Sequence, residues 1–83
     1  MKEELSQTVL LRAFGRVVRM RRTELELTQE EVARRSGLHR TYIGDIERGT
    51  RNVALFNLWR LASALDLEAE ELMRRIGREA GDK

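Results

Sequence analysis

The sequence predicts an all-α fold of five short helices, and three observations lead to that prediction. Apolar residues recur every three or four positions, which is the spacing of a helix rather than the alternation of a strand. The chain contains no proline, and its breaks fall at glycines and polar clusters. Capping signals mark the ends of the second helix. With 83 residues, the chain is expected to form one compact domain (residues 1–83), with a core over about 8–78 and a polar C-terminal tail.

The first helix is expected over residues 8–24, where a long segment keeps one apolar face. Either Ser6 or Thr8 can cap its start, because both offer a hydroxyl to the first turn. The residues on its apolar face are Leu11, Phe14, Val18 and then Met20 or Arg22.

The second and third helices are expected to form a helix-turn-helix. Thr28 can accept from the first turn of the second helix while Glu31 reaches back, which is a capping box. This helix should end at Ser36-Gly37, where glycine supplies a left-handed cap. The third helix follows at about residues 40–47, so only a tight glycine turn separates the two.

Two more helices are expected after the loop at residues 48–52. The fourth covers about 55–65 and the fifth about 68–78, with Asp66-Leu67 between them. Their expected core residues are Leu55, Leu58, Leu61, Ala62 and Leu65, followed by Leu72, Met73 and Ile76.

Composition excludes several classes of protein. The absence of cysteine rules out disulfides and thiolate metal sites, and one histidine cannot build an imidazole site. No ligand-sensing domain fits in this length, so we expect no metal, no cofactor and no small-molecule ligand. No apolar run is long enough to cross a bilayer, and Met1–Leu5 lack the apolar stretch of a signal peptide. These features predict a cytoplasmic protein.

The arrangement of charge is more informative than its total. The net charge is only +2, from 16 basic and 14 acidic residues. Residues 34–51, however, hold five arginines against Asp45 and Glu47. Arginine suits bidentate contact with phosphate and guanine, although arginines on a solvated, salt-bridged helix would give the same composition.

Spaced segments of the chain resemble one family of regulators. They are Thr28-Gln29-Glu30-Glu31-Val32-Ala33, Ser36-Gly37-Leu38, Tyr42-Ile43 and Ile46-Glu47-Arg48-Gly49. These segments are similar to the phage-repressor/Cro helix-turn-helix regulators over about residues 10–76, which implies a lambda-repressor-like DNA-binding fold. Within that family, Arg40-Thr41-Tyr42-Ile43 and Arg51-Asn52 most resemble the controller proteins of restriction–modification systems. That resemblance implies a homodimer that binds double-stranded DNA and regulates its own operon.

One residue departs from the family pattern. The residue before the fourth helix is usually serine or threonine in this family and acts as N-cap, whereas this chain has Ala54. Losing such a cap costs about 1 kcal/mol. Either Asn52 compensates from nearby or the helix begins elsewhere.

Four residues of the third helix are expected to face the bases in the major groove. Arg40 can donate twice to guanine O6 and N7, or it can contact a phosphate instead. Thr41 follows on the exposed face, and Gly44 allows a close approach to DNA despite its cost in helix stability. The carboxylate of Asp45 either accepts from cytosine N4 or restrains a neighbouring arginine.

A second group is expected at the phosphate backbone: Gln29, His39, Tyr42, Arg48, Arg51 and Asn52. The resemblance implies that Gln29 both binds phosphate and braces the reading helix. His39 can alternatively cap the third helix, and Tyr42 can alternatively pack beneath it. Four arginines of the first helix are expected mostly on a solvated face, with one in reach of phosphate: Arg12, Arg16, Arg19 and Arg21.

Other residues are expected to support the structure. Ile43 and Ile46 face inward by their spacing. The resemblance implies an ion pair between Arg22 and Glu47 that joins the first and third helices. Phe56 and Trp59 lie off the apolar stripe of the fourth helix, where they either cap the core or form an interface. We favour a twofold dimer through these aromatic residues, joined by Leu67, Leu72 and Ile76.

Two other functions fit parts of the sequence less well. An antitoxin can use this fold to bind its operator and neutralise a toxin, but Gly77–Lys83 offer little to occupy a toxin. An enzyme has no support, because there is no Cys/His pair, no metal-spaced carboxylate cluster and no phosphate-cradling glycine loop. The acidic run Glu68, Glu70 and Glu71 suits the first turn of a helix. The sequence therefore favours a dimeric, sequence-specific transcriptional regulator that binds a pseudo-palindromic operator.

Overall fold

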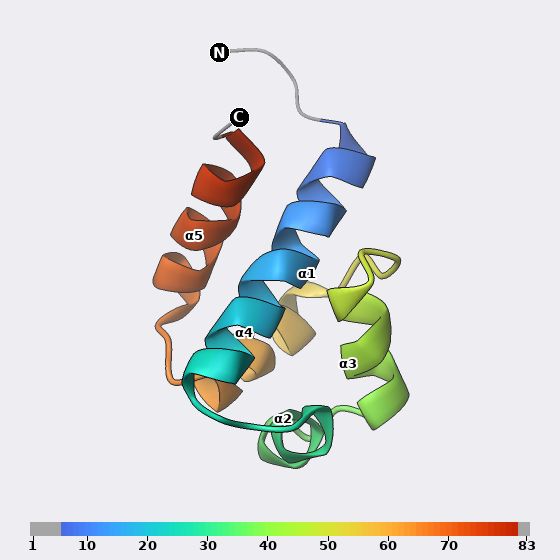
Figure 1. Ribbon diagram of the computed structural model, residues 1–83, viewed down its shortest axis with the longest axis vertical. Coiled ribbons are helices and arrows are strands. Elements are labelled where there is room, and N and C mark those ends of the chain that lie inside the picture. The colour runs from blue at the N-terminus through green and yellow to red at the C-terminus, as the bar shows by residue number, and fades with distance from the viewer. Residues whose placement is uncertain (1–5, 82–83) are drawn as a thin grey trace.

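The computed structural model describes residues 6–81, and these residues form five helices (Figure 1). Residues 1–5, on which the expectation about a signal peptide depends, and residues 82–83 lie outside the described part. The helices are α1 (Gln7–Glu24), α2 (Gln29–Ser36), α3 (Arg40–Glu47), α4 (Leu55–Ala64) and α5 (Ala69–Gly81). The predicted all-α fold is confirmed over the described residues.

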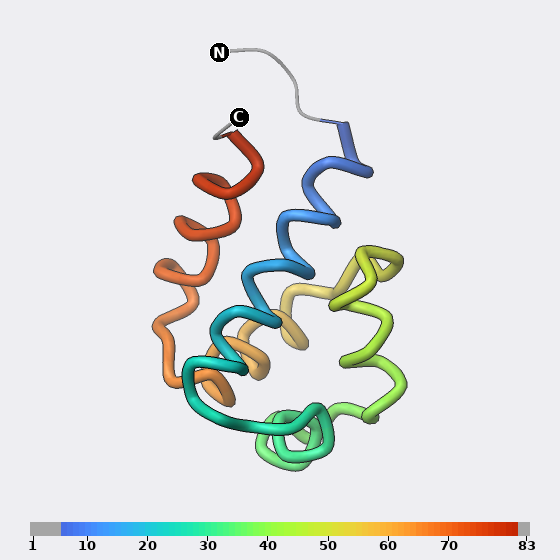
Figure 2. The backbone as a smooth tube through the Cα atoms, in the orientation of Figure 1, coloured from blue at the N-terminus to red at the C-terminus, as the bar shows by residue number. Residues whose placement is uncertain are grey.

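The long helix α1 lies at the centre of the molecule. α5 packs along one side of α1 and α3 along the other (Figure 1). α2 contacts both α3 and α4, and α4 also contacts α5. The backbone tube shows the tight turn between α2 and α3 (Figure 2). It also shows α3 at the edge of the molecule away from α5.

Local capping interactions set the first helix boundaries. The hydroxyl of Ser6 accepts from the amide of Val9 at 3.1 Å, so Ser6 rather than Thr8 caps α1. At α2, the Thr28 hydroxyl accepts from the Glu31 amide at 3.0 Å and the Glu31 carboxylate accepts from the Thr28 amide at 2.7 Å. The backbone hydrogen bond from Thr28 lowers the pKa of Glu31, and Arg34 and Arg35 add to the effect. The capping box is therefore complete.

The helix α4 begins without a side-chain cap. Ala54 occupies the N-cap position, and no side chain bonds to the first turn. The helix starts at Leu55 as expected, so Asn52 does not compensate and the helix does not begin elsewhere. Packing of α4 against α2 and α5 stabilises the helix and offsets the stability lost with the cap.

The core forms where the apolar faces of the helices meet. Its largest fully buried side chains include Ile43 and Ile46 of α3, as predicted. Leu55 was expected in this core, but it is 80% exposed. The α4 residues that turn toward α2 and α5 instead follow later: Leu61, Ala62, Ala64 and, just beyond the helix, Leu65. Leu55 lies at the uncapped end of α4, and its side chain is left in solvent.

The helix α5 is packed more completely than the sequence suggested. Leu72 is fully buried and Ile76 is 4% exposed, because α5 lies along α1. Neither side chain is available to a second subunit, so the expectation that they form a dimer interface is wrong. Met73, expected in the core, is 47% exposed. The helix continues to Gly81 and buries Ala80, where a polar tail was expected.

Candidate nucleic-acid interface

The first turn of α3 projects two polar side chains into solvent. Arg40 and Thr41 are both exposed at the start of the helix. His39 is the N-cap, and its Nδ1 accepts from the Thr41 amide at 3.4 Å. A neutral imidazole that accepts at Nδ1 carries its proton at Nε2, so His39 still has a donor for an anion. Arg40 forms no ion pair with any acid among residues 6–81, which leaves its guanidinium free to donate.

A buried acid fixes the other end of α3. Glu47 is 5% exposed and accepts two hydrogen bonds from Arg22 of α1, at 2.6 and 3.0 Å. It also accepts from the side-chain nitrogen Nε2 of Gln29 at 3.0 Å. The hydrogen bond to Glu47 raises the pKa of Arg22, which therefore stays charged. The ion pair expected between α1 and α3 is present, and Gln29 extends it to α2.

The loop after α3 is organised by Asp45. Its carboxylate accepts from Arg51 at 2.9 Å and from Arg48. Its backbone carbonyl accepts from both the amide and the hydroxyl of Thr50, at 3.0 and 3.1 Å. The bond from Arg51, followed by that from Arg48, lowers the pKa of Asp45. Of the two alternatives for Asp45, the free chain shows the one in which it restrains neighbouring arginines.

Tyr42 lies beneath this loop rather than projecting from it. Its ring packs against the core and is half-buried. The guanidinium of Arg51 lies 4.5 Å from the ring centroid, within the range of a cation–π contact. Its hydroxyl accepts from the side-chain amide of Asn57 at 3.2 Å. Tyr42 thus supports Arg51, and its hydroxyl keeps a proton to donate.

Gly44 does not offer the open surface that the sequence suggested. The residue is buried, and a Cβ atom at this position would lie 3.4 Å from Arg48 Nη1 and 3.7 Å from Gln29 Oε1. The side chains of Arg48 and Gln29 therefore cover this point of the helix. A base can reach Gly44 only if those side chains move aside, so the expectation of direct contact at Gly44 is corrected.

The structure brings most of the predicted DNA-binding residues together. Gln29 and Arg40 line one hollow, together with Glu30. A neighbouring hollow is lined by His39, Thr41, Tyr42 and Arg51. Asn52 is the exception, because it lines an apolar hollow beside Leu10, Val53 and Met73. Asn52, although it follows Arg51 directly, therefore borders a different hollow from the one that Arg51 lines.

Tertiary packing gives the arginines of α1 different surroundings, which the sequence alone did not predict. A Cβ atom on Gly49 would lie 3.2 Å from the Cα of Arg12, so Arg12 adjoins the loop that carries Arg48. Arg16 instead pairs with Glu79 of α5 at 2.7 Å. Arg21 donates to the Leu65 carbonyl at 2.9 Å. Arg12 thus extends the basic surface around α3.

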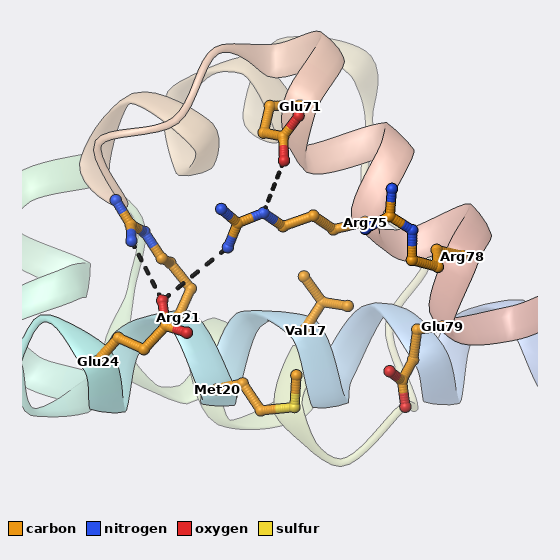
Figure 3. Close-up of a pocket in the computed structure, with 8 residues that line it drawn as sticks. All are labelled: Val17, Met20, Arg21, Glu24, Glu71, Arg75, Arg78 and Glu79. Carbon is orange, nitrogen blue, oxygen red and sulfur yellow. Dashed lines mark hydrogen bonds and ion pairs between the residues drawn. The ribbon is translucent and has the colours of Figure 1, made fainter. Parts of the chain in front are cut away.

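A hollow of about 390 Å³ lies between α1 and α5 (Figure 3). Arg75 crosses it and contacts Glu71 at 2.9 Å and Glu24 at 3.9 Å. Three arginines and three glutamates line it, so it has no net charge with which to attract an ion. Residues 6–81 contain no group of three acidic or imidazole side chains placed to hold a metal. The ion pairs here join α5 to α1.

One further surface is apolar and exposed. Leu55, Phe56 and Trp59 of α4 are 80%, 67% and 63% exposed. Leu67 is half-buried and lines a hollow with Trp59. The guanidinium of Arg60 lies 5.2 Å from the ring centroid of Phe56. We call Leu55, Phe56, Trp59 and Leu67 the α4 patch.

No helix in the described part of the chain has the length and apolar character needed to cross a membrane.

Comparisons with known proteins agree with this geometry. A family model described as helix-turn-helix matches residues 18–72. The control protein C.BamHI of Bacillus amyloliquefaciens is 46% identical over 72% of this chain and 75% of its own. The crystal structure of the restriction–modification controller protein C.AhdI from Aeromonas hydrophila is 52% identical, with a TM-score of 0.72, over 75% of this chain and 94% of that one.

A third similarity is to a protein solved together with DNA. The restriction–modification controller protein C.Esp1396I, crystallised as a tetramer with its natural 35 base-pair operator, is 32% identical with a TM-score of 0.78. The match covers 86% of this chain and 93% of that one. The chain belongs to the helix-turn-helix family, among the controller proteins of restriction–modification systems.

Proposed function

We propose that this chain is a sequence-specific DNA-binding regulator that binds a pseudo-palindromic operator as a homodimer and controls its own restriction–modification operon. The observation that carries the proposal is the first turn of α3. There Arg40 and Thr41 project into solvent from a helix held by the Arg22–Glu47 ion pair. A fixed helix with free donors at its N-terminal end is what major-groove readout requires.

The residues around α3 supply the sequence-independent part of binding. Gln29, His39, Arg48 and Arg51 lie beside the helix and carry donors that suit phosphate oxygens. Such contacts fix the register of the protein on DNA, while base contacts select the sequence. We assign Arg40 and Thr41 to base edges, and we add Arg12 to the phosphate contacts.

A homodimer is proposed through the α4 patch. An exposed cluster of large apolar side chains on so small a protein marks an interface. Twofold helix-turn-helix dimers place their recognition helices about one DNA turn apart, roughly 34 Å, so a dimer of this chain predicts an operator with two inverted half-sites. The operator complex of C.Esp1396I supports this kind of assembly in a relative. A regulator of this type acts in the cytoplasm and needs neither a catalytic group nor a cofactor.

The test is DNase footprinting on the DNA immediately upstream of the gene for this chain. We expect wild type to protect two inverted half-sites at moderate salt. Arg40→Ala should lose about 1–3 kcal/mol of discrimination at one guanine in each half-site, because a bidentate contact is removed. Arg78→Ala, on the exposed surface of α5, is the matched control and should leave the footprint unchanged.

Two outcomes would change these assignments. Failure of wild type to protect any site would contradict the regulator proposal. A loss of affinity that is equal for all base variants would assign Arg40 to a phosphate instead of a base.

A further inference from the structure

The loop that follows α3 carries two arginines that are held back before any DNA is present. Asp45 Oδ2 accepts from Arg51 at 2.9 Å and Oδ1 accepts from Arg48. The Asp45 side chain is 21% exposed, while those of Arg48 and Arg51 are 64% and 44% exposed. The acid is therefore partly shielded, while both of its partners remain largely accessible to solvent.

The same residue also fixes the backbone of the loop. The carbonyl of Asp45 accepts from the amide and the hydroxyl of Thr50. Arg51 is held from its other face by the Tyr42 ring, 4.5 Å away. Arg40, in contrast, pairs with no acid among residues 6–81. The arginine proposed to read bases is thus free, whereas the two proposed to bind phosphate share one carboxylate, so the cluster keeps only one of their two positive charges uncompensated.

From this arrangement we infer that Asp45 is a positioning residue that determines DNA selectivity, by holding Arg48 and Arg51 until correctly placed phosphates displace its carboxylate. The inference rests on the proposed DNA-binding function. When α3 is correctly docked, the DNA brings phosphates to both arginines together, and the contacts with these phosphates replace both bonds to Asp45. When α3 is misplaced on the DNA, the two phosphates do not reach both arginines. The arginines then stay paired with Asp45 and contribute little to the affinity for DNA.

The consequence is a penalty that falls mainly on nonspecific binding. Nonspecific affinity depends on the number of phosphates that free cations neutralise, and each adds about 0.9 to the salt slope on a duplex. By keeping two cations out of nonspecific complexes, Asp45 widens the difference between operator and random DNA. Selectivity of this kind weakens binding to nonspecific DNA and adds no contact with the operator.

The experiment measures two affinities for each variant of the full chain. The probes are a duplex of the footprinted sequence and a duplex with the same bases in shuffled order, each titrated over a series of salt concentrations. For Asp45→Asn we expect affinity for the shuffled duplex to rise about tenfold and its salt slope to steepen by about 1–2. Affinity for the operator should change by less than about threefold, so the ratio of the two affinities falls.

Four controls separate this role from a general change of charge. Glu30→Gln beside Arg40 and Glu71→Gln on α5 remove the same charge and should leave the ratio unchanged. Asp45→Glu should restore the wild-type ratio. In a chain that already carries Arg48→Ala and Arg51→Ala, Asp45→Asn should no longer affect binding to the shuffled duplex.

The outcomes distinguish failure of this inference from failure of the proposed function. An unchanged ratio in Asp45→Asn, or an equal shift in Glu30→Gln, overturns the inference. So does a change of preference at a single base pair, which would assign the carboxylate to base reading. Wild type that binds both duplexes equally, or neither, overturns the proposed function itself. Circular dichroism checks that each variant folds, and Asp45→Ser provides a second neutral variant.

Discussion

At the scale of single residues, Glu47 has the largest structural role at the interface. Its carboxylate accepts from Arg22 on α1 and Gln29 on α2, so one side chain ties three helices together. Arg22 also donates to the Leu27 carbonyl at 2.9 Å. Because the acid is almost fully buried, removing it leaves a guanidinium without its partner in a poorly solvated site.

We predict that Glu47→Ala lowers the free energy of unfolding by about 3–5 kcal/mol, the cost of breaking a buried ion pair from one side. Glu47→Gln should lose less, since its amide oxygen still accepts from Arg22. Urea denaturation followed by circular dichroism measures both. A loss in Glu47→Ala no larger than that of the exposed control Glu70→Ala would show that the pair contributes little to stability.

At the scale of the helices, α1 closely approaches the end of α3 at Gly15. A Cβ atom on Gly15 would lie 2.5 Å from the carbonyl oxygen of Ile46 and 2.6 Å from that of Glu47. Both contacts are with backbone, which cannot move aside as a side chain can. Glycine in a helix interior is unfavourable by roughly 1 kcal/mol relative to alanine. That cost is offset here because α1 can pack directly on the end of the recognition helix.

The two glycines at positions 15 and 77 allow a matched test of this packing. Gly15→Ala should lower the free energy of unfolding by about 1–3 kcal/mol, because an added methyl overpacks the contact between α1 and α3. A Cβ atom on Gly77 meets nothing within 4 Å. Gly77→Ala should therefore stabilise the fold by about 0.5–1 kcal/mol. Thermal unfolding compares the two, and stabilisation by both would contradict the close approach.

At the scale of the whole molecule, the basic and apolar surfaces lie on different elements. The basic residues surround α3, while the α4 patch leaves Phe56 and Trp59 exposed. The proposed DNA contacts belong to α3 and the loop after it, whereas the exposed aromatic side chains belong to α4. One surface can therefore contact DNA while another contacts a second subunit.

We predict that a variant carrying Phe56→Ser and Trp59→Ser sediments as a monomer at concentrations where wild type is a dimer. Both side chains are mostly exposed, so the fold of each subunit should survive the change. Operator affinity should fall steeply, because the two half-sites are no longer bound together. Met20→Ser, an exposed apolar residue on α1, is the control and should stay dimeric. A wild-type chain that is monomeric at high concentration would remove the proposed interface.

The helix boundaries and the recognition helix could be predicted from the sequence, because the interactions that set them span three or four residues. Thr28 and Glu31 complete a capping box within one turn. Gly37 adopts a φ of 75°, which glycine reaches without strain, and so ends α2. The exposed Arg40 and the inward Ile43 and Ile46 follow from helical periodicity alone.

Periodicity identifies the apolar face of a helix but not the neighbour that covers it. The stripe of Leu72 and Ile76 is buried where α5 packs against α1 and α4, and so leaves nothing for a partner. Leu55 extends the stripe of α4 beyond the helices that could bury it.

The sequence by itself determined five helices, their capping and a reading helix with Arg40 at its start. The Arg22–Glu47 pair was expected from the family resemblance, but the other contacts between distant side chains were decided by the tertiary structure. It joined Gln29 to Glu47, placed Asn52 at an apolar hollow, and placed Arg12 beside Gly49. These residues are distant along the chain, and helix packing sets the distances between them. Asp45 depends on both the local sequence and the tertiary structure. Helix geometry places its side chain near Arg48, while the fold of the loop brings Arg51 to the same carboxylate.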